Sequence, residues 1–266
     1  MKLRQALLGL TLTAALVLPA SAAEVLSVNG ENLWNQAGAR LVEDTTYVSL
    51  RTVSQALAPG AQVAWEDGAA RVRTGEVTLT ARPGDQWLRV NGRALYIPGG
   101  VLLEGGSTMV PVRVLANALG ASVDWDRERG VTLTAGDGTP SPASYSEEDL
   151  YWMSRIISAE SRGEPMLGKL AVGTVVLNRV ASGEFPDTIR EVIFDRQWGV
   201  QFAPVANGSV YDEPTEESVL AAMLVLDGAR AAGESLYFLA PELTDNHWTM
   251  ENRTHVTTIG CHWFYK

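Results

Sequence analysis

The chain has 266 residues, of which 46% are hydrophobic and 20% are charged, and its formal net charge is −10 at pH 7. This length fits one large domain or two modest ones. An acidic surface repels phosphate backbones and anionic lipids, which excludes nucleic acid and membrane surfaces as expected partners. Cys261 is the only cysteine, so packed cores rather than an intramolecular disulfide must supply the stability. We expect its thiol to be buried and inert.

The first 22 residues predict a cleaved export signal. Lys2 and Arg4 precede an apolar run from Ala6 to Leu18, and the small residues at positions 20 and 22 suit signal peptidase. The run is too short to cross a bilayer comfortably as a helix. We therefore expect a signal peptide at 1–22, no membrane span after its cleavage, and a secreted or cell-envelope location.

Residues 23–134 contain a sequence repeat. Val-Asn-Gly at 28–30 recurs at 90–92, and the segment 47–51 is matched by 109–113. Each copy predicts a hairpin turning at Asn-Gly, a short amphipathic helix and a strand pair, which makes a β-β-α-β-β unit. One unit alone buries little apolar surface, so the two should pack together as one α+β domain. We expect the repeat-equivalent Trp65 and Trp125 to lie in its core.

A linker and a second domain follow the repeat. Residues 135–144 are rich in Gly, Pro and Ser and predict a linker that buries little surface. From residue 145 the composition shifts to helix formers, and the second domain spans 145–266. Its first helix should begin after Ser146 as the N-cap, with Asp149 completing a capping box.

This first helix carries the strongest candidate for catalysis. At helical spacing its apolar stripe consists of Leu150, Met153 and Ile157. The next position on the stripe is Glu160, so its carboxyl group should point toward the interior. Burial raises the pKa of a carboxyl group, as a general acid requires near neutral pH. A structural ion pair of Glu160 with Arg155 or Arg162 is the alternative.

The remaining elements of the second domain follow from periodicity. Residues 167–180 and 215–231 predict helices, and 236–239 and 253–264 predict strands. The segment 197–208 predicts a loop rich in amides and aromatic residues. Such residues are typical of sugar recognition, and they are also typical of the core of a small domain.

Two segments at 157–165 and 171–180 resemble the signature of SleB/CwlJ-type cell wall hydrolases, the spore cortex-lytic enzyme family. Further motifs of that family follow in the same order, at 185–189, 201–202, 236–238 and 259–264. The resemblance covers the whole second domain. It implies a lysozyme-like, resuscitation-factor-like α+β catalytic fold, peptidoglycan as the substrate, and the acid/base role for Glu160.

The same motifs suggest how substrate is held. Gln201, Phe202, Tyr237 and His262 are expected to bind it, because aromatic faces stack on sugars and amides bond to hydroxyl and N-acetyl groups. We expect no metal and no cofactor. The N-terminal repeat resembles the copper amine oxidase N-terminal-like domain of exported wall proteins, a fold that implies no copper by itself. This domain is a candidate for contact with the wall or with an accessory protein.

The implied chemistry is cleavage of glycan strands in cell wall or spore cortex remodelling. A lytic transglycosylase needs one carboxyl group, which protonates the bridging oxygen and then deprotonates the sugar's own 6-hydroxyl, leaving 1,6-anhydromuramyl ends. The resemblance favours this route. A muramidase-type hydrolase needs a second carboxylate, and the candidates are Glu164, Glu184 and Asp195.

Two alternatives come from other classes. A zinc-dependent peptidoglycan amidase would have to draw its ligands from His247, His255 and His262, which lack the short-range spacing typical of zinc sites. A non-catalytic wall-binding protein would carry a degenerate second domain. The intact motif around Glu160 argues against that interpretation.

Overall fold

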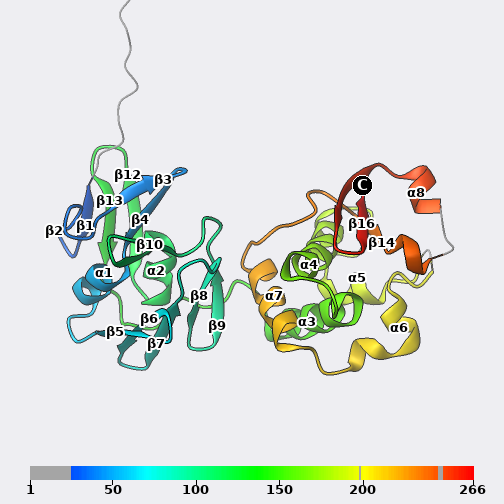
Figure 1. The fold of residues 1–266 in the computed structure, drawn as a ribbon, viewed down its shortest axis with the longest axis horizontal. Helices are drawn as coiled ribbons and strands as arrows, with labels where there is room; N and C mark the ends of the chain where they lie inside the picture. The colour runs from blue at the N-terminus through cyan, green and yellow to red at the C-terminus, as the bar shows by residue number, and fades with distance from the viewer. Residues whose placement is uncertain (1–24, 198, 245–247) are drawn as a thin grey trace, which may run out of the picture.

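A computed structural model describes residues 25–197, 199–244 and 248–266. The predicted signal peptide lies outside these residues. Figure 1 shows a strand-rich N-terminal unit beside a helix-rich C-terminal unit. Each unit has its own cluster of buried hydrophobic side chains. The described part of the chain contains no helix that is both long and apolar enough to cross a membrane.

The N-terminal unit contains the two repeat copies, and each has one more hairpin than predicted. The first copy consists of β1 (Leu26–Val28), β2 (Glu31–Asn32), β3 (Arg40–Val42), β4 (Thr45–Ser49), α1 (Leu50–Leu57), β5 (Gln62–Glu66) and β6 (Ala69–Thr74). After β7 (Val77–Ala81), the second consists of β8 (Trp87–Val90), β9 (Arg93–Tyr96), β10 (Leu102–Glu104), β11 (Ser107–Pro111), α2 (Val112–Ala118), β12 (Ser122–Asp126) and β13 (Gly130–Thr134). The additional turns are Glu43-Asp44 and Gly105-Gly106, all with positive φ.

Strand pairing interleaves the two copies. β4 and β11 pair antiparallel with Val48 opposite Val110, so equivalent strands of the two copies meet at the centre. β1 of the first copy pairs in parallel with β13 of the second. The five-stranded sheet β5-β6-β7-β8-β9 also joins both copies. Neither copy could therefore form its sheets alone, which agrees with the prediction that they build one domain.

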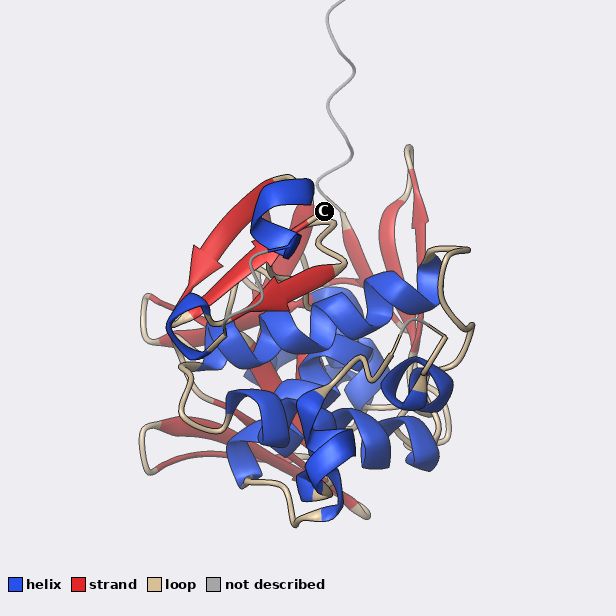
Figure 2. Ribbon diagram, turned by 90° about the vertical axis from the view of Figure 1, so that its right-hand side faces the viewer, coloured by secondary structure: helices blue, strands red, loops and turns tan. Residues whose placement is uncertain are grey.

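The C-terminal unit consists of helices and one small sheet. Its helices are α3 (Glu147–Ser161), α4 (Met166–Ala181), α5 (Ile189–Phe194), α6 (Ala203–Asn207), α7 (Glu216–Leu226) and α8 (Trp248–Asn252). The sheet has the order β14 (Tyr237–Leu239), β16 (His262–Tyr265) and β15 (His255–Ile259). Figure 2 views the molecule from the side of this unit, with its helices and small sheet toward the viewer. The α+β class is confirmed.

Two predicted elements of this unit differ in length or type. α7 ends at Leu226, earlier than the predicted residue 231, because Gly228 has a φ of 113° that no right-handed helix can contain. The predicted loop at 197–208 contains the short helix α6, which ends at Gly208 in the left-handed conformation. The predicted helix at 167–180 is confirmed as α4.

The two units contact each other directly, and the linker is not free. Ala94 of β9 is fully buried in the hydrophobic cluster of the C-terminal unit. Asp227, at the end of α7, accepts a hydrogen bond from the Tyr96 backbone N–H (2.8 Å) and pairs with Arg93 (3.3 Å). The Ser141 backbone N–H of the linker donates to the Asn117 carbonyl oxygen (2.8 Å). Residues 135–144 are all exposed or half-buried, so the linker buries little, as predicted, although it contacts the N-terminal unit.

Candidate active site

Helix α3 places Glu160 at the edge of the core. Ser146 caps the helix by accepting from the Asp149 backbone N–H (3.1 Å), and the Asp149 carboxylate accepts from the Ser146 backbone N–H (3.0 Å). Ile156 and Ile157, one turn before Glu160, are fully buried. Glu160 itself is partly buried, as the apolar stripe predicts.

The environment of Glu160 favours its protonated form. Burial raises the pKa of its carboxyl group to about 7, and the positive charge of Arg179 opposes this rise only in part. The alternative, an ion pair of Glu160 with Arg155 or Arg162, is wrong, because both arginines contact Glu213 instead. Arg155 pairs with the Glu213 carboxylate (3.3 Å), and Arg162 donates to the Glu213 carbonyl oxygen (3.2 Å). Glu160 can therefore exchange a proton near neutral pH.

Arg179 on α4 is the central cation of this region, and the sequence analysis did not single it out. It is only 4% exposed, its Nε donates to the Leu236 carbonyl oxygen (2.8 Å), and burial lowers its pKa to about 10. The charge interactions of Tyr237, Asp195 and Glu160 with the guanidinium oppose that lowering. Its position inside the family-like segment 171–180 was the signal that could have identified it.

Aromatic rings surround the Arg179 guanidinium. Its Cζ atom lies 4.8 Å from the centroid of Phe185, 5.0 Å from that of Phe202 and 5.7 Å from that of Tyr237. A buried guanidinium is well accommodated by aromatic faces because their π-electrons attract the cation. Arg179 thus links α4 to the start of α6 and to β14.

The predicted substrate-binding residues fall into two groups. Gln201 and Tyr237 are partly exposed, and the Tyr237 hydroxyl accepts from Arg253 (2.9 Å). Phe202 is only 2% exposed and His262 only 7%. Other protein groups cover most of both rings, and their role in substrate binding stays a prediction. Phe202 packs against Arg179 and Phe238, and His262 meets Phe238 edge-on at 5.3 Å.

The three candidate second carboxylates lie in different surroundings. Glu164 is 8% exposed and contacts Cys261 and His262. Glu184 is exposed. Asp195 is partly buried, accepts from the Gln197 backbone N–H (2.9 Å) and shares Arg179 with Glu160. Asp195 is therefore the candidate that the fold brings to the region of Glu160.

The histidines do not form the cluster that a zinc amidase would need. His255 is exposed, and its Nε2 lies 3.0 Å from the Thr258 hydroxyl oxygen. His247 lies outside the described residues. Among those described, the only three potential metal ligands that converge are Glu164, Cys261 and His262. Cys261 is exposed, so the prediction of a buried thiol is wrong.

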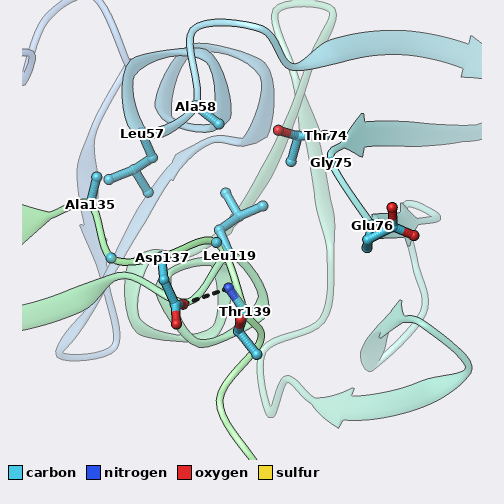
Figure 3. Close-up of a pocket in the computed structure, with 11 residues that line it drawn as sticks. Leu57, Ala58, Thr74, Gly75, Glu76, Leu119, Ala135, Asp137 and Thr139 are labelled. Atoms are coloured by element: carbon cyan, nitrogen blue, oxygen red, sulfur yellow. Dashed lines mark hydrogen bonds between the residues drawn. The ribbon is translucent and has the colours of Figure 1, made fainter.

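Cavities in the N-terminal unit carry no comparable chemistry. The pocket in Figure 3, with a volume of about 460 Å³, lies where the linker crosses the ends of α1 and α2. Its only ionisable lining residues are Glu76 and Asp137, and the Asp137 carboxylate accepts from the Thr139 backbone N–H (2.8 Å). Apolar side chains such as Leu57 and Leu119 form much of the remaining lining.

Comparison with known proteins assigns both units. Residues 163–265 match the family described as Cell Wall Hydrolase, and residues 27–134 match the copper amine oxidase N-terminal domain. The cell wall hydrolase CwlJ of Oceanobacillus iheyensis is 30% identical over 104 residues, which cover 37% of this chain and 72% of that protein. The chain belongs to the cell wall hydrolase family.

Other relatives of this cell wall hydrolase are spore cortex-lytic enzymes. That of Bacillus cereus is 38% identical over 129 residues, covering 48% of each chain. A solved structure, the catalytic domain of the germination-specific lytic transglycosylase SleB from Bacillus anthracis, has 37% sequence identity and a TM-score of 0.43. The match covers 47% of this chain and 99% of that one. The present chain spans about half the length of the spore cortex-lytic enzymes that it matches.

Proposed function

We propose that this cell wall hydrolase cleaves the glycan strands of peptidoglycan in the cell wall or spore cortex, with Glu160 as its acid/base. The observation that carries the proposal is the partly buried carboxyl group of Glu160, whose pKa of about 7 leaves both protonation states accessible near neutral pH. The relatives named as spore cortex-lytic enzymes and as a lytic transglycosylase support this substrate class.

The proposed reaction proceeds without a second catalytic carboxylate. Protonated Glu160 donates its proton to the glycosidic oxygen, and the bond from that oxygen to the muramyl C1 breaks. The resulting Glu160 carboxylate accepts the proton of the muramyl 6-hydroxyl, whose oxygen bonds to C1. The products are a 1,6-anhydromuramyl end and a free hydroxyl on the leaving sugar. The tethered hydroxyl has a high effective concentration compared with an unpositioned water molecule.

A muramidase-type hydrolase is the second candidate, and Asp195 is the residue that favours it. Asp195 interacts electrostatically with the same Arg179 guanidinium as Glu160. Its carboxylate is therefore the candidate general base that would activate water. Glu164 and Glu184 have weaker support, since Glu164 is held by Cys261 and Glu184 is exposed away from these contacts. The amidase and the non-catalytic interpretations draw no comparable support from the site.

The first test replaces the proton donor. Glu160→Gln keeps the size and hydrogen-bonding capacity of the side chain but cannot donate a proton to the bridging oxygen. We expect the rate of wall lysis to fall by about 100-fold or more, the scale of acid/base catalysis. The measurement is the loss of turbidity of purified peptidoglycan, with circular dichroism to verify folding. Glu184→Gln, at an exposed position, is the matched control; a Glu160→Gln variant as active as this control would refute the assignment.

The second test identifies the product. Mass spectrometry of released muropeptides should show anhydromuramyl ends that are lighter by one water, resist borohydride reduction and take up no label from heavy-oxygen water. Reducible, labelled muramic acid ends would instead establish a hydrolase. In that case Asp195→Asn should abolish activity as fully as Glu160→Gln does.

We infer that the protein acts in the cell envelope and that its N-terminal unit contacts the wall. Trp65 and Trp125, at equivalent positions of the two copies, are 54% and 56% exposed, contrary to the expectation that they lie in the core. Each lines a pocket together with the arginine of its own copy, Arg51 or Arg113, and with at least one threonine of the other copy. A pair of equivalent aromatic platforms suits a repeating glycan, because sugar rings stack on exposed indoles.

A further inference from the structure

We propose that Glu164, Cys261 and His262 form a binding site for a divalent transition metal ion, with Zn²⁺ as the ion that this donor set fits best. One oxygen, one sulfur and one nitrogen atom of these side chains all lie within 4.8 Å of one another. The residues come from two distant parts of the chain, the turn between α3 and α4 and the hairpin between β15 and β16. The fold therefore assembles the group.

The His262 ring provides an independent indication of a ligand. Its Nδ1 is buried and has no hydrogen-bond partner among the described residues, and the residue is only 7% exposed. A buried polar atom without a partner loses its hydration and gains nothing in return. Glu164 Oε1 lies 4.0 Å from this atom, which is too far for a hydrogen bond. A neutral imidazole has a lone pair that can bind a metal.

The Glu164 carboxylate is also left without a neutralising cation. Its side chain is 7% exposed, and the ion pairs of the described residues bring only His262 near it. The neighbouring Lys169 ammonium donates to the carbonyl oxygens of Arg162 and Glu164 and pairs with the exposed Glu217. A buried carboxylate is costly unless it is paired or coordinates a metal. A bound cation would supply the missing charge.

The backbone of the hairpin is shaped to receive this carboxylate. Gly260 has a φ of 60°, and a Cβ atom at this position would overlap Glu164 Oε2. The same oxygen accepts a hydrogen bond from the Cys261 backbone N–H (3.3 Å), and the Cys261 thiol contacts Oε1. The absence of a side chain at Gly260 thus allows the carboxylate to lie against the turn that presents both other ligands.

The donor set indicates the class of metal. One thiolate, one imidazole and one carboxylate form a mixed S, N and O set that suits zinc, whereas Mg²⁺ and Ca²⁺ prefer oxygen alone. Tetrahedral zinc bonds place ligand atoms roughly 3.3–3.6 Å apart. Separations of up to 4.8 Å in the present group would have to shorten by about 1.2–1.5 Å to reach this geometry. Cys261 lies exposed at the hairpin turn, where such a movement is easiest. Three protein ligands leave the fourth coordination position to a water molecule.

This site would join two segments of the C-terminal unit and act separately from glycan chemistry. Glu164 follows the last turn of α3, four residues after Glu160, so a metal bridge would tie that segment to the β15–β16 hairpin. It differs from the zinc amidase considered above, because His255 takes no part. The proposal does not depend on glycan cleavage: metal binding and wall lysis are measured separately, and either result can fail alone.

The experiment uses the single thiol of the full chain as its reporter. Purified, metal-stripped protein is titrated with Zn²⁺ and, in parallel, with Co²⁺. We expect one equivalent to bind, to protect Cys261 from Ellman's reagent until a chelator is added, and to release a proton. The proton released is that of the Cys261 thiol, which binds the metal as a thiolate. Co²⁺ should give a thiolate-to-cobalt charge-transfer band and the intense visible bands of a tetrahedral site.

Matched variants decide the result. Cys261→Ser changes one atom at an exposed position, so it should fold and bind Zn²⁺ at least about tenfold more weakly, without the charge-transfer band. His262→Gln should also weaken binding, with circular dichroism to verify its fold. His255→Gln, which alters an exposed histidine bonded to Thr258, should bind as wild type does. Unprotected thiol at saturating Zn²⁺, or equal affinity of wild type and Cys261→Ser, would overturn the proposal.

Discussion

At the scale of single residues, the protonation of Glu160 depends on a competition between burial and one nearby cation. Desolvation disfavours the carboxylate, and Arg179 favours it, and the pKa of about 7 shows that desolvation is the larger effect. Arg179 in turn is held by the Leu236 carbonyl oxygen and by aromatic rings, so its charge has a fixed position. The reactivity of Glu160 is therefore set by residues of α4, β14 and α6 as much as by α3.

This balance predicts the pH dependence of catalysis. The first step of the proposed reaction needs protonated Glu160, which predominates below its pKa of about 7. We expect kcat/KM on soluble glycan fragments to be high below neutrality and to fall as the pH rises through about 7. An unburied glutamate, with a pKa near its ordinary value of 4.5, would lose activity at far lower pH. A profile that falls already between about pH 4 and 5 would show that Glu160 is not buried in solution.

The pH dependence of the free energy of unfolding tests the raised pKa of Glu160 independently of catalysis. The folded pKa of Glu160 lies above its unfolded value, so the folded state retains a proton that the unfolded state releases. The free energy of unfolding should therefore decrease as the pH rises from about 4.5 to about 7, by on the order of 1–3 kcal/mol. Glu160→Gln removes this group, so the variant should be more stable than wild type above about pH 8. Thermal unfolding across this pH range measures the difference.

At the scale of elements, α7 ends on a carboxylate that the helix itself disfavours. Asp227 lies at the C-terminal end of α7, where the helix dipole is negative. Its two oxygens accept from the Tyr96 backbone N–H and pair with Arg93, both on β9. Strand β9 thus provides the positive partners that the end of α7 lacks. The contact joins the two units through charge as well as through the buried Ala94.

The contact between α7 and β9 is testable by a single substitution. Asp227→Ala removes both interactions and leaves the Tyr96 N–H without its partner, which should lower the free energy of unfolding by about 1–3 kcal/mol. We also expect faster proteolytic cleavage within the linker at 135–144. Asp212→Ala, at an exposed position after the turn at 209–211, is the control. Equal stability and equal cleavage rates for the two variants would show that Asp227 does not hold the units together.

At the scale of the whole molecule, the N-terminal unit presents a paired surface, formed by the exposed Trp65 and Trp125, beside the C-terminal unit. Trp65 on β5 and Trp125 on β12 occupy equivalent positions because the two copies are related about the β4–β11 pair. The unit thus presents its exposed aromatic residues twice. Two weak contacts on one polymer act together, since the second binds at a high effective concentration once the first is made.

The paired surface predicts how wall binding is lost. Trp65→Ala and Trp125→Ala should each reduce sedimentation of the protein with purified peptidoglycan, and the double variant should reduce it by more than the product of the single effects. Cleavage of short, soluble glycan fragments should be unchanged, because neither residue lies in the C-terminal unit. Leu103→Ala, another exposed apolar residue of the N-terminal unit, is the control. Undiminished sedimentation of the double variant would exclude this surface.

Local patterns in the sequence were sufficient for much of this protein. The spacing of Leu150, Met153 and Ile157 predicted α3 and the burial of Glu160, because one helix face follows directly from a period of 3.6 residues. The capping box at Ser146 is equally local and is confirmed. The paired motifs predicted the repeat. The additional hairpin, which turns at Gly105-Gly106, was missed, although a Gly-Gly pair is itself a local turn signal.

Contacts between distant segments were decided only by the tertiary structure. Arg179 reaches Glu160 and Asp195 because α4 packs beside α3, and no spacing within one helix contains that information. Cys261 and Glu164 meet although 97 positions separate them. The exposure of Trp65 and Trp125, and the burial of Phe202, depend on which neighbours cover each ring. Periodicity predicts which face of an element is apolar, whereas the packing of elements determines what each face meets.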